Sequence, residues 1–261
     1  MAEILYLVHR FPWPPNKGDK IRSYHVLRHL AARYRVHLGT FVDDPHDWRY
    51  LAEVEDLCES VCALPLARLL GQVRAMRGLF SGKPLTLPWY QDRRLHKWVC
   101  NVLRERQIGA ALAFSSSMGQ YLPLSAQLRR VVDFVDVDSD KWRQYAQTQG
   151  FPMSLLYSRE ARLLGRYEQR LAERCHAGLF VSEQEVALFK SQADAAGDTP
   201  RRSRLEVMGN GVDTDYFTPQ QVGDSPYPLG ELPLVLSGAM DYWPNVDAAC
   251  WFARQVLPGV R

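Results

Sequence analysis

The feature that most constrains the fold is a regular alternation of short apolar runs with longer amphipathic stretches. Strand-like runs fall at 4–8, 36–42, 60–64, 110–114, 131–135, 179–181 and 205–208. Helix-like stretches fall between them, at 19–33, 47–58, 66–80, 91–106, 138–148, 155–174 and 183–190. This alternation is typical of a mostly parallel sheet with helices on both faces. Several of the runs lack polar alternation, as expected of strands buried on both faces. The sequence therefore predicts a doubly wound, Rossmann-like α/β fold.

The texture of the chain changes after Asp213. Residues 214–233 carry six prolines and glycines and no apolar period, which is typical of a linker. Residues 234–238 resemble a strand that runs into a glycine turn, and 244–256 resemble a helix. One strand–helix unit cannot bury both of its faces. We therefore expect a domain at 1–213, a linker at 214–233 and the truncated start of a second domain at 234–261. Because residues 234–261 would leave an open strand edge and an apolar face exposed, we expect them to self-associate.

Composition excludes several classes of protein. The 261 residues are 46% apolar and 23% charged, as in soluble globular proteins. Neither a signal peptide nor an apolar run of ~20 residues is evident, which favours a cytoplasmic protein. A net charge of +3 is too weak to indicate nucleic acid. The five cysteines and seven histidines follow no metal-binding spacing, so we expect reduced thiols, no metal and no cofactor.

A proline-rich loop at 12–22 follows the first predicted strand. Ligands of open parallel sheets bind beyond the carboxyl ends of the strands, where the next helix presents free N–H groups. Gly18 would allow close backbone approach, Asn16, Lys17 and Arg22 would donate hydrogen bonds, and Asp19 would be the N-cap. The alternative is an ordinary turn stiffened by prolines. Its length favours a ligand-binding loop.

Four carboxylates mark the end of the strand predicted at 131–135: Asp133, Asp136, Asp138 and Asp140. Such a cluster can bind metal, transfer protons or hydrogen-bond sugar hydroxyls. Capping of the next helix by Asp138 or Ser139 is the structural alternative, and it leaves Asp136 without a structural task. A catalytic and a structural role for Asp136 both stay open.

The stretch at 155–174 has an apolar stripe at helical spacing and charges of alternating sign, which favours a helix that covers the sheet. Glu160 and Glu168 stand eight residues apart within it, the spacing of an ExxxxxxxE motif. We interpret both glutamates as structural.

Four segments, in order and spacing, carry a family resemblance. They are Gly18–Arg22, the acidic segment 133–142, Ser182, and Asn210-Gly211-Val212-Asp213 with Phe217. The set resembles the N-terminal, acceptor-side domain of glycosyltransferase family 4. The first two segments are similar to the bacterial sugar transferases found with exopolysaccharide and exosortase systems.

The resemblance implies two facing Rossmann-like domains that transfer a sugar from a nucleotide-sugar with retention of configuration and without a metal. It implies contact with the donor diphosphate and sugar for Asn16, Lys17, Gly18, Asp19, Arg22 and Gly238. It places Asp136 at the catalytic centre, and on the acceptor side Asp138, Lys141, Trp142, Ser182, Asn210 and Gly211. The chain lacks the ExxxxxxxE motif of the second domain and the basic residues that many members carry at the equivalent of 237–245. We therefore expect the chain to be inactive by itself.

Two other functions stay open: a stand-alone Rossmann-like binding or scaffold module, and a sugar-nucleotide epimerase of similar two-domain shape. An epimerase would need a carboxylate–histidine network, for which the chain offers His9, His25 and the acidic segment.

Residues 66–90 combine an apolar helical arc with arginines, Lys83, Trp89 and Tyr90. This combination suits peripheral contact with the inner membrane, and with it a lipid-linked sugar or polysaccharide acceptor. The alternative is a helix that only covers the sheet.

Overall fold

The computed structural model describes residues 1–66, 82–125, 127–196, 204–218, 227–228, 233–238, 240 and 243–260. The chain divides into two compact units, Met1–Gly211 and Val212–Arg261. The two units are described separately below.

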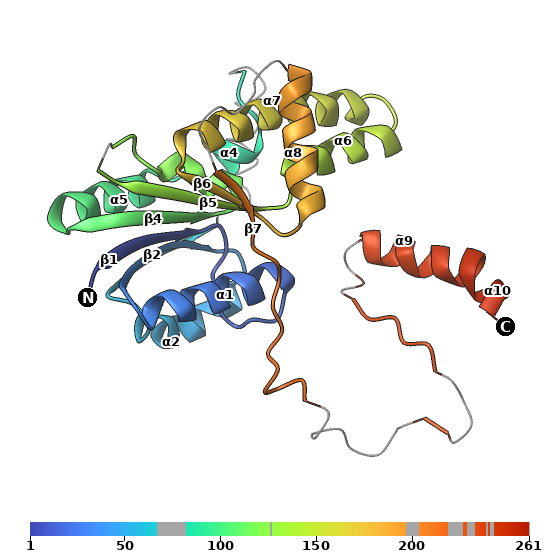
Figure 1. Ribbon diagram of the computed structural model, residues 1–261, viewed down its shortest axis with the longest axis horizontal. Coiled ribbons are helices and arrows are strands. Elements are labelled where there is room, and N and C mark those ends of the chain that lie inside the picture. The colour runs from blue at the N-terminus through green and yellow to red at the C-terminus, as the bar shows by residue number, and fades with distance from the viewer. Residues whose placement is uncertain are drawn as a thin grey trace. The chain divides into compact units, whose positions relative to one another are not determined.

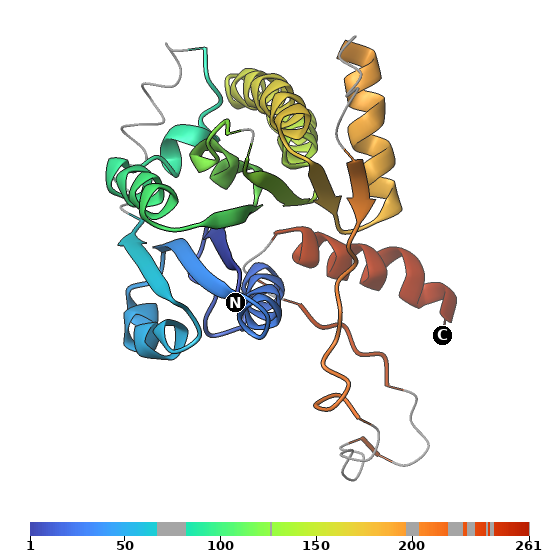
Figure 2. The same ribbon diagram turned by 60° about the vertical axis from the view of Figure 1, so that its left-hand side comes forward.

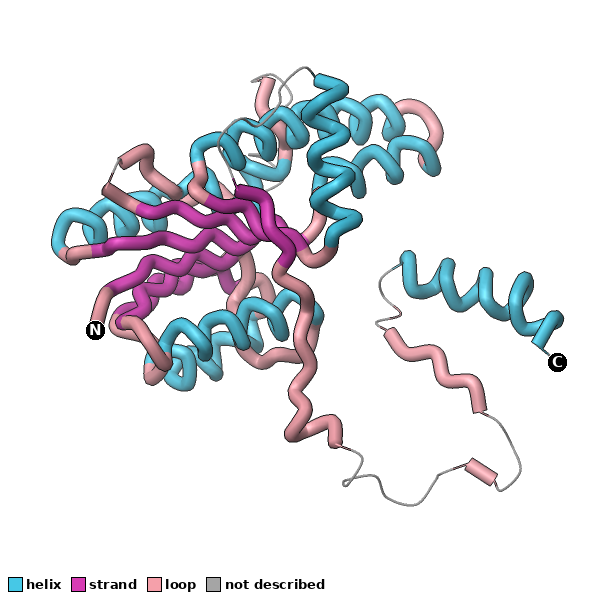
Figure 3. The backbone as a smooth tube through the Cα atoms, in the orientation of Figure 1, coloured by secondary structure: helices cyan, strands magenta, loops and turns pink. Residues whose placement is uncertain are grey.

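The first unit is built on a sheet of seven strands (Figures 1 and 3). The strands are β1 (Glu3–Val8), β2 (Arg35–Val42), β3 (Ser60–Pro65), β4 (Ile108–Phe114), β5 (Arg129–Val135), β6 (Ala177–Phe180) and β7 (Arg204–Val207). Their order is β3-β2-β1-β4-β5-β6-β7, and every neighbouring pair is parallel. This architecture confirms the predicted fold class. The chain winds outward in one direction from β1 and in the other from β4, so these strands flank the topological switch point.

Helices cover both faces of the sheet (Figures 1 and 2). On one face lie α1 (Gly18–Ala31) and α2 (Leu51–Glu55), and on the other α5 (Arg93–Glu105), α7 (Met153–Arg174) and α8 (Glu183–Ala196). Strand β1 serves both cores by alternation: Leu5 and Leu7 join the α5 side, while Tyr6 and Val8 join the α1 side. All four side chains are fully buried. Double-sided burial explains why this run has no polar residue.

Several connections are irregular. The predicted helix at 47–58 is a 3-10 turn, η1 (Pro45–Tyr50), followed by α2. Two short elements were not predicted, α4 (Thr86–Trp89) and the 3-10 helix η2 (Ser116–Tyr121). Helix α6 (Asp138–Thr148) packs against α7 through the rings of Trp142, Tyr145 and Tyr157. The helix predicted at 66–80 lies, apart from its first residue, outside the described residues.

The second unit contains α9 (Trp243–Trp251), the π-helical turn η4 (Phe252–Val256) and α10 (Leu257–Val260). These elements include the helix predicted at 244–256. The strand predicted at 234–238 was wrong, because these residues form no strand and Leu234, Val235 and Leu236 are exposed. A strand needs a hydrogen-bonding partner, and the described residues of this unit contain none. Across the described chain, no helix has the length and apolarity needed to span a bilayer.

Candidate functional site

The carboxyl edge of the sheet gathers the loops that follow the strands. Because all seven strands are parallel, the segments after β1, β4, β5 and β7 emerge at this one edge. Gly18 opens α1 after the β1 loop, and Asp136 directly follows β5. Both predicted segments therefore lie at the same edge, which is where ligands bind in open α/β sheets.

His9 occupies the switch point itself. Its ring stacks on Phe114, the last residue of β4, at 5.7 Å and 10°, and meets Tyr90 edge-on at 5.8 Å. Its Nε2 lies 3.6 Å from the Asp19 carboxylate, and its buried Nδ1 has no hydrogen-bond partner among the described residues. The sequence interpretation did not include His9 among the site residues. Its position directly after the first strand was the signal that could have identified it.

Asp19 lies beside His9 in the first turn of α1. The helix begins one residue earlier and Lys17 is its N-cap, so the prediction of Asp19 as N-cap was wrong. The Asp19 carboxylate accepts a hydrogen bond from Arg10, which also pairs with Asp43 at 3.3 Å. Burial acts to raise the pKa of Asp19, but His9, Arg10 and the N–H of Lys20 together lower it well below its usual range. Asp19 is therefore ionised at neutral pH.

The N-terminus of α1 is open at this edge. Asn16, Lys17 and Gly18 are exposed, and a Cβ built on Gly18 would meet no atom within 4 Å. Lys17 forms no ion pair with any described residue. The N-terminus of α1 and Lys17 are thus exposed at this edge, an arrangement that suits an anion.

Arg22 is placed differently from the donor-binding role predicted for it. Its side chain is buried, and its Nε and NH2 groups donate to the two carboxylate oxygens of Asp133 at 2.9 and 3.2 Å. Its NH1 group donates to Asn210 at 2.9 Å. Burial raises the pKa of Asp133, while the ion pair with Arg22 opposes the rise. Arg22 therefore ties α1 to β5 and to the segment after β7.

The acidic segment forms a compact ion-pair cluster. The ammonium group of Lys141 lies 2.9 Å from the Asp136 carboxylate and 3.1 Å from that of Asp138. Burial acts to lower the pKa of Lys141, but these two carboxylates raise it. Helix α6 begins at Asp138 after Val137, without a side-chain cap, so the expected capping by Asp138 or Ser139 was wrong.

Two strained residues lie at this edge. Val135 has φ 67° and Ser115 has φ 77°, although neither residue is a glycine. A β-branched residue in the left-handed region is costly, and such strain concentrates at functional sites. Val135 immediately precedes Asp136, so the strain coincides with the turn that delivers the predicted catalytic carboxylate.

Other predicted site residues have structural surroundings. Trp142 belongs to the aromatic cluster between α6 and α7, and Ser182 accepts a hydrogen bond from the N–H of Glu185 at the start of α8. Gly211 is exposed, and Gly238 lies in the second unit against the side chain of Asn245. The structure thus brings together two groups, Asp136 with Asp138 and Lys141, and Arg22 with Asn210.

The two glutamates of α7 also have structural surroundings. The Glu160 carboxylate accepts hydrogen bonds from the N–H groups of Leu85 and Thr86 and from the Thr86 hydroxyl, and so holds the start of α4. Glu168 is buried, and the hydroxyl and N–H groups of Ser139 lie beside its carboxylate and act to lower its pKa. Burial and the charge of Asp138 raise the pKa of Glu168 to about 8. No group of three or more metal-ligating side chains converges within the described residues.

Comparison with known proteins supports the fold. No family model and no curated protein matches the chain. Among solved structures, the fold is similar to sucrose-phosphate synthase from Thermosynechococcus elongatus, with a TM-score of 0.54 and 13% identity over 84% of this chain and 50% of that one.

Two further solved structures have lower scores. The first is the N-terminal domain of trehalose-6-phosphate phosphatase from Candida albicans, with a TM-score of 0.48 and 12% identity over 83% of this chain and 50% of that one. The second is UGT73P12 from Glycyrrhiza uralensis in complex with glycyrrhetinic acid 3-O-monoglucuronide, with a TM-score of 0.42 and 11% identity over 80% of this chain and 48% of that one. The chain spans about half the length of these proteins. The chain therefore shares a Rossmann-like α/β fold with half of the sucrose-phosphate synthase structure.

Proposed function

We propose that the protein carrying this chain is a retaining glycosyltransferase of family 4. It would move a sugar from a nucleotide-sugar to a lipid-linked or polysaccharide acceptor in bacterial exopolysaccharide or cell-surface glycan synthesis. The observation that carries the proposal is the open N-terminus of α1 at the switch point of a glycosyltransferase-like fold.

The donor half of the proposal rests on charge and space. A diphosphate needs N–H donors, positive potential and close backbone approach. Gly18 leaves the space open, Lys17 is an unpaired cation among the described residues, and α1 supplies the helix dipole. Arg10, Lys20 and Arg22 are held in ion pairs, so they act by shaping the loop.

The acceptor half rests on Asp136 and His9. Asp136 keeps about a third of its side chain exposed while Lys141 holds it in place. In the proposed reaction, the bond between the sugar C1 and the diphosphate oxygen breaks. The acceptor oxygen bonds to C1 on the same face, and its proton passes to the departing diphosphate. Asp136 would orient the acceptor hydroxyl, and His9, positioned by the ionised Asp19, would hydrogen-bond the transferred sugar.

The proposal includes a cytoplasmic location at the inner membrane through residues 66–90. Of these, 67–81 lie outside the described residues. Tyr90 is half-buried, and its ring lies against His9 and Phe41. Co-sedimentation with anionic vesicles should weaken with salt and with substitution of Arg74, Arg77 and Lys83 by glutamate. Salt-independent sedimentation would contradict the electrostatic contact.

A transfer assay tests the proposal. The protein, expressed from its complete reading frame, is incubated with a panel of nucleotide-sugars and a bacterial lipid extract. We expect one donor to yield a glycosylated lipid or polysaccharide in which NMR shows a retained anomeric configuration, and D136N to lower the rate at least tenfold. Conversion of a nucleotide-sugar without an acceptor would indicate an epimerase instead. Binding without turnover across the panel would indicate a binding module.

A further inference from the structure

A groove lies between α5 and α7, on the face of the sheet opposite α1. The connection from β4 to β5 contains only the six-residue η2 instead of a full crossover helix, so the described residues leave space between α5 and α7. The result is a cavity of about 890 Å³ lined by residues of α4, α5, η2 and α7. Ligand-binding pockets commonly enclose roughly 300–1,000 Å³. The groove is therefore large enough for a small organic molecule.

The lining of the groove is strongly basic. It contains five cations: Lys83, Arg93, Lys97, Arg166 and Arg170. None of the five forms an ion pair with a described residue. The one acidic residue of the lining is Asp92, and its carboxylate accepts three hydrogen bonds from Arg94. The sequence from 60 to 91 contains no aspartate or glutamate, so no counter-ion comes from the neighbouring segment.

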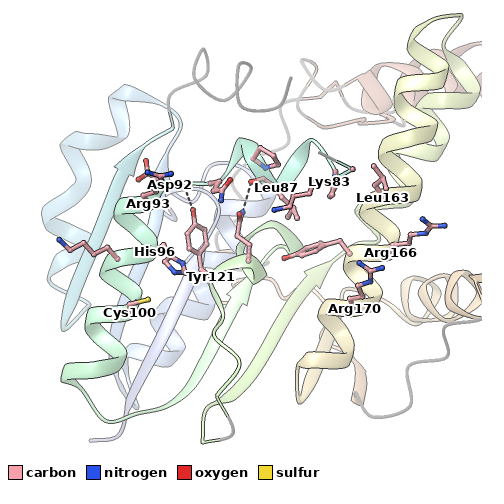
Figure 4. Close-up of a pocket in the computed structure, with 17 residues that line it drawn as sticks. Lys83, Leu87, Asp92, Arg93, His96, Cys100, Tyr121, Leu163, Arg166 and Arg170 are labelled. Atoms are coloured by element: carbon pink, nitrogen blue, oxygen red, sulfur yellow. Dashed lines mark hydrogen bonds between the residues drawn. The ribbon is translucent and has the colours of Figure 1, made fainter. Parts of the chain in front are cut away.

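The floor of the groove is aromatic and apolar. Figure 4 shows Tyr121 between the side chains of α5, among them His96 and Cys100, and those of α7, among them Leu163 and Arg170. The Tyr121 hydroxyl donates to the carbonyl of Tyr90 at 2.5 Å, and the Tyr167 hydroxyl donates to that of Ser116 at 3.1 Å. Both hydroxyls are thus directed at the backbone. The Tyr121 ring is buried against Phe41 and His96, whereas the Tyr167 ring is only partly buried at the edge of the groove.

These features select the chemistry of a ligand. Unpaired arginines recognise phosphoryl oxygens through two parallel hydrogen bonds. A free inorganic anion would leave the partly exposed side chains of Leu87, Leu163 and Tyr167 uncovered. A phosphate or diphosphate joined to an apolar group would satisfy both parts of the lining.

We propose that the groove between α5 and α7 is a second binding site, for a phosphate-bearing amphiphile. Its phosphoryl groups bind Arg93, Arg166 and Arg170, and its apolar part lies on Leu163 and Tyr167. The ligand has two sources with the same chemistry, a soluble organic diphosphate and the headgroup of a membrane lipid. The site is separate from the proposed sugar-transfer edge, and its existence does not depend on that activity.

The test measures binding to the whole protein by two probes. Isothermal titration with geranyl diphosphate represents the soluble source, with inorganic pyrophosphate as a comparison that lacks the apolar part. Sedimentation with phosphatidylglycerol vesicles, against phosphatidylcholine vesicles, represents the lipid source. We expect geranyl diphosphate to bind at least tenfold more tightly than pyrophosphate, or the anionic vesicles to bind selectively.

Two charge-matched variants separate the groove from general electrostatics. R166E/R170E changes the groove, whereas R28E/K190E makes the same change in net charge at exposed positions on α1 and α8, outside the groove lining. All four substitutions are at exposed positions, and circular dichroism checks that the fold is retained. We expect the groove variant to lose at least tenfold in affinity and the control less than twofold. The probe that shows this difference identifies the source. Equal losses in both variants, or no binding of either probe, would overturn the proposal.

Discussion

Two buried carboxylates of the first unit lie in opposite surroundings. Asp133 is held by a bidentate arginine, Arg22, whereas Glu168 forms no ion pair with a described residue and lies beside the hydroxyl and N–H groups of Ser139. A buried charge is tolerated when it is paired, and a buried acid without a partner is instead retained in its neutral form. Burial raises the pKa of both carboxyl groups, but only Asp133 depends on a cationic partner, so the two residues respond in different ways to substitution.

Glu168 makes stability depend on pH. Its pKa rises from 4.5 to about 8 on folding, so between these values the folded state binds a proton that the unfolded state has released. The free energy of unfolding then falls as pH rises, by up to about 1.4 kcal/mol per pH unit. E168Q removes this dependence. We expect the stability of E168Q relative to the wild type to increase from pH 5 to pH 8 in urea titrations. A difference that stays constant over this range would contradict the neutral state of Glu168.

Arg22 is expected to be essential for stability. Replacing one partner of a buried ion pair leaves the other charge uncompensated, so R22M should lower the free energy of unfolding at pH 7 by about 3–5 kcal/mol. The cost should shrink at acid pH, where Asp133 is protonated. R28M, at an exposed position of the same helix, should change stability by less than about 0.5 kcal/mol. Chemical denaturation measures the free energy of unfolding of both variants. Equal losses in R22M and R28M would show that the ion pair between Arg22 and Asp133 does not stabilise the fold.

At the scale of elements, η2 is held tightly against α7. A Cβ at Gly119 would overlap Leu171 Cδ2 and lie 2.6 Å from Cδ1, and Leu171 is itself buried in the core. G119A should therefore cost about 1–3 kcal/mol through overpacking. G109A, where the added Cβ meets nothing within 4 Å, is the matched control and should have little effect on thermal unfolding. If G119A and G109A have the same thermal unfolding midpoint, η2 is less tightly packed than its contacts with Leu171 indicate.

Elements buried on both faces were predictable from the sequence, and elements defined by tertiary contacts were not. Runs such as 4–8 and 131–135 are apolar because both sheet faces are covered, and they correspond to β1 and β5. The short α4 is held by Glu160, which is 74 residues away from Thr86, and η2 carries no helical periodicity. The predicted strand at 234–238 shows the converse error, because local pattern cannot supply the missing partner strand.

At the scale of the first unit, the sequence predicted correctly at which edge of the sheet the site segments lie, but it did not predict which side chains contact one another there. Loops after β1 and β5 were predicted to meet because parallel strands end together, and they do. Pairings across more than a hundred residues, such as Arg22 with Asp133, leave no local signal, so Arg22 was predicted to bind ligand. His9 was named only as a candidate for an epimerase, because a single histidine after a strand has no transferase motif. Its place at the site arises from β4 beside it.

The central claim is that the open N-terminus of α1 receives the donor diphosphate in a sugar-transfer reaction. The most direct measurement compares initial rates of transfer for G18E and G150E. Both positions are exposed glycines without neighbours within 4 Å, so neither substitution should change the unfolding midpoint. G18E places a carboxylate where the diphosphate would bind, and we expect kcat/KM to fall at least 100-fold, while G150E retains wild-type rates. Transfer by G18E at the rate of G150E would contradict the claim.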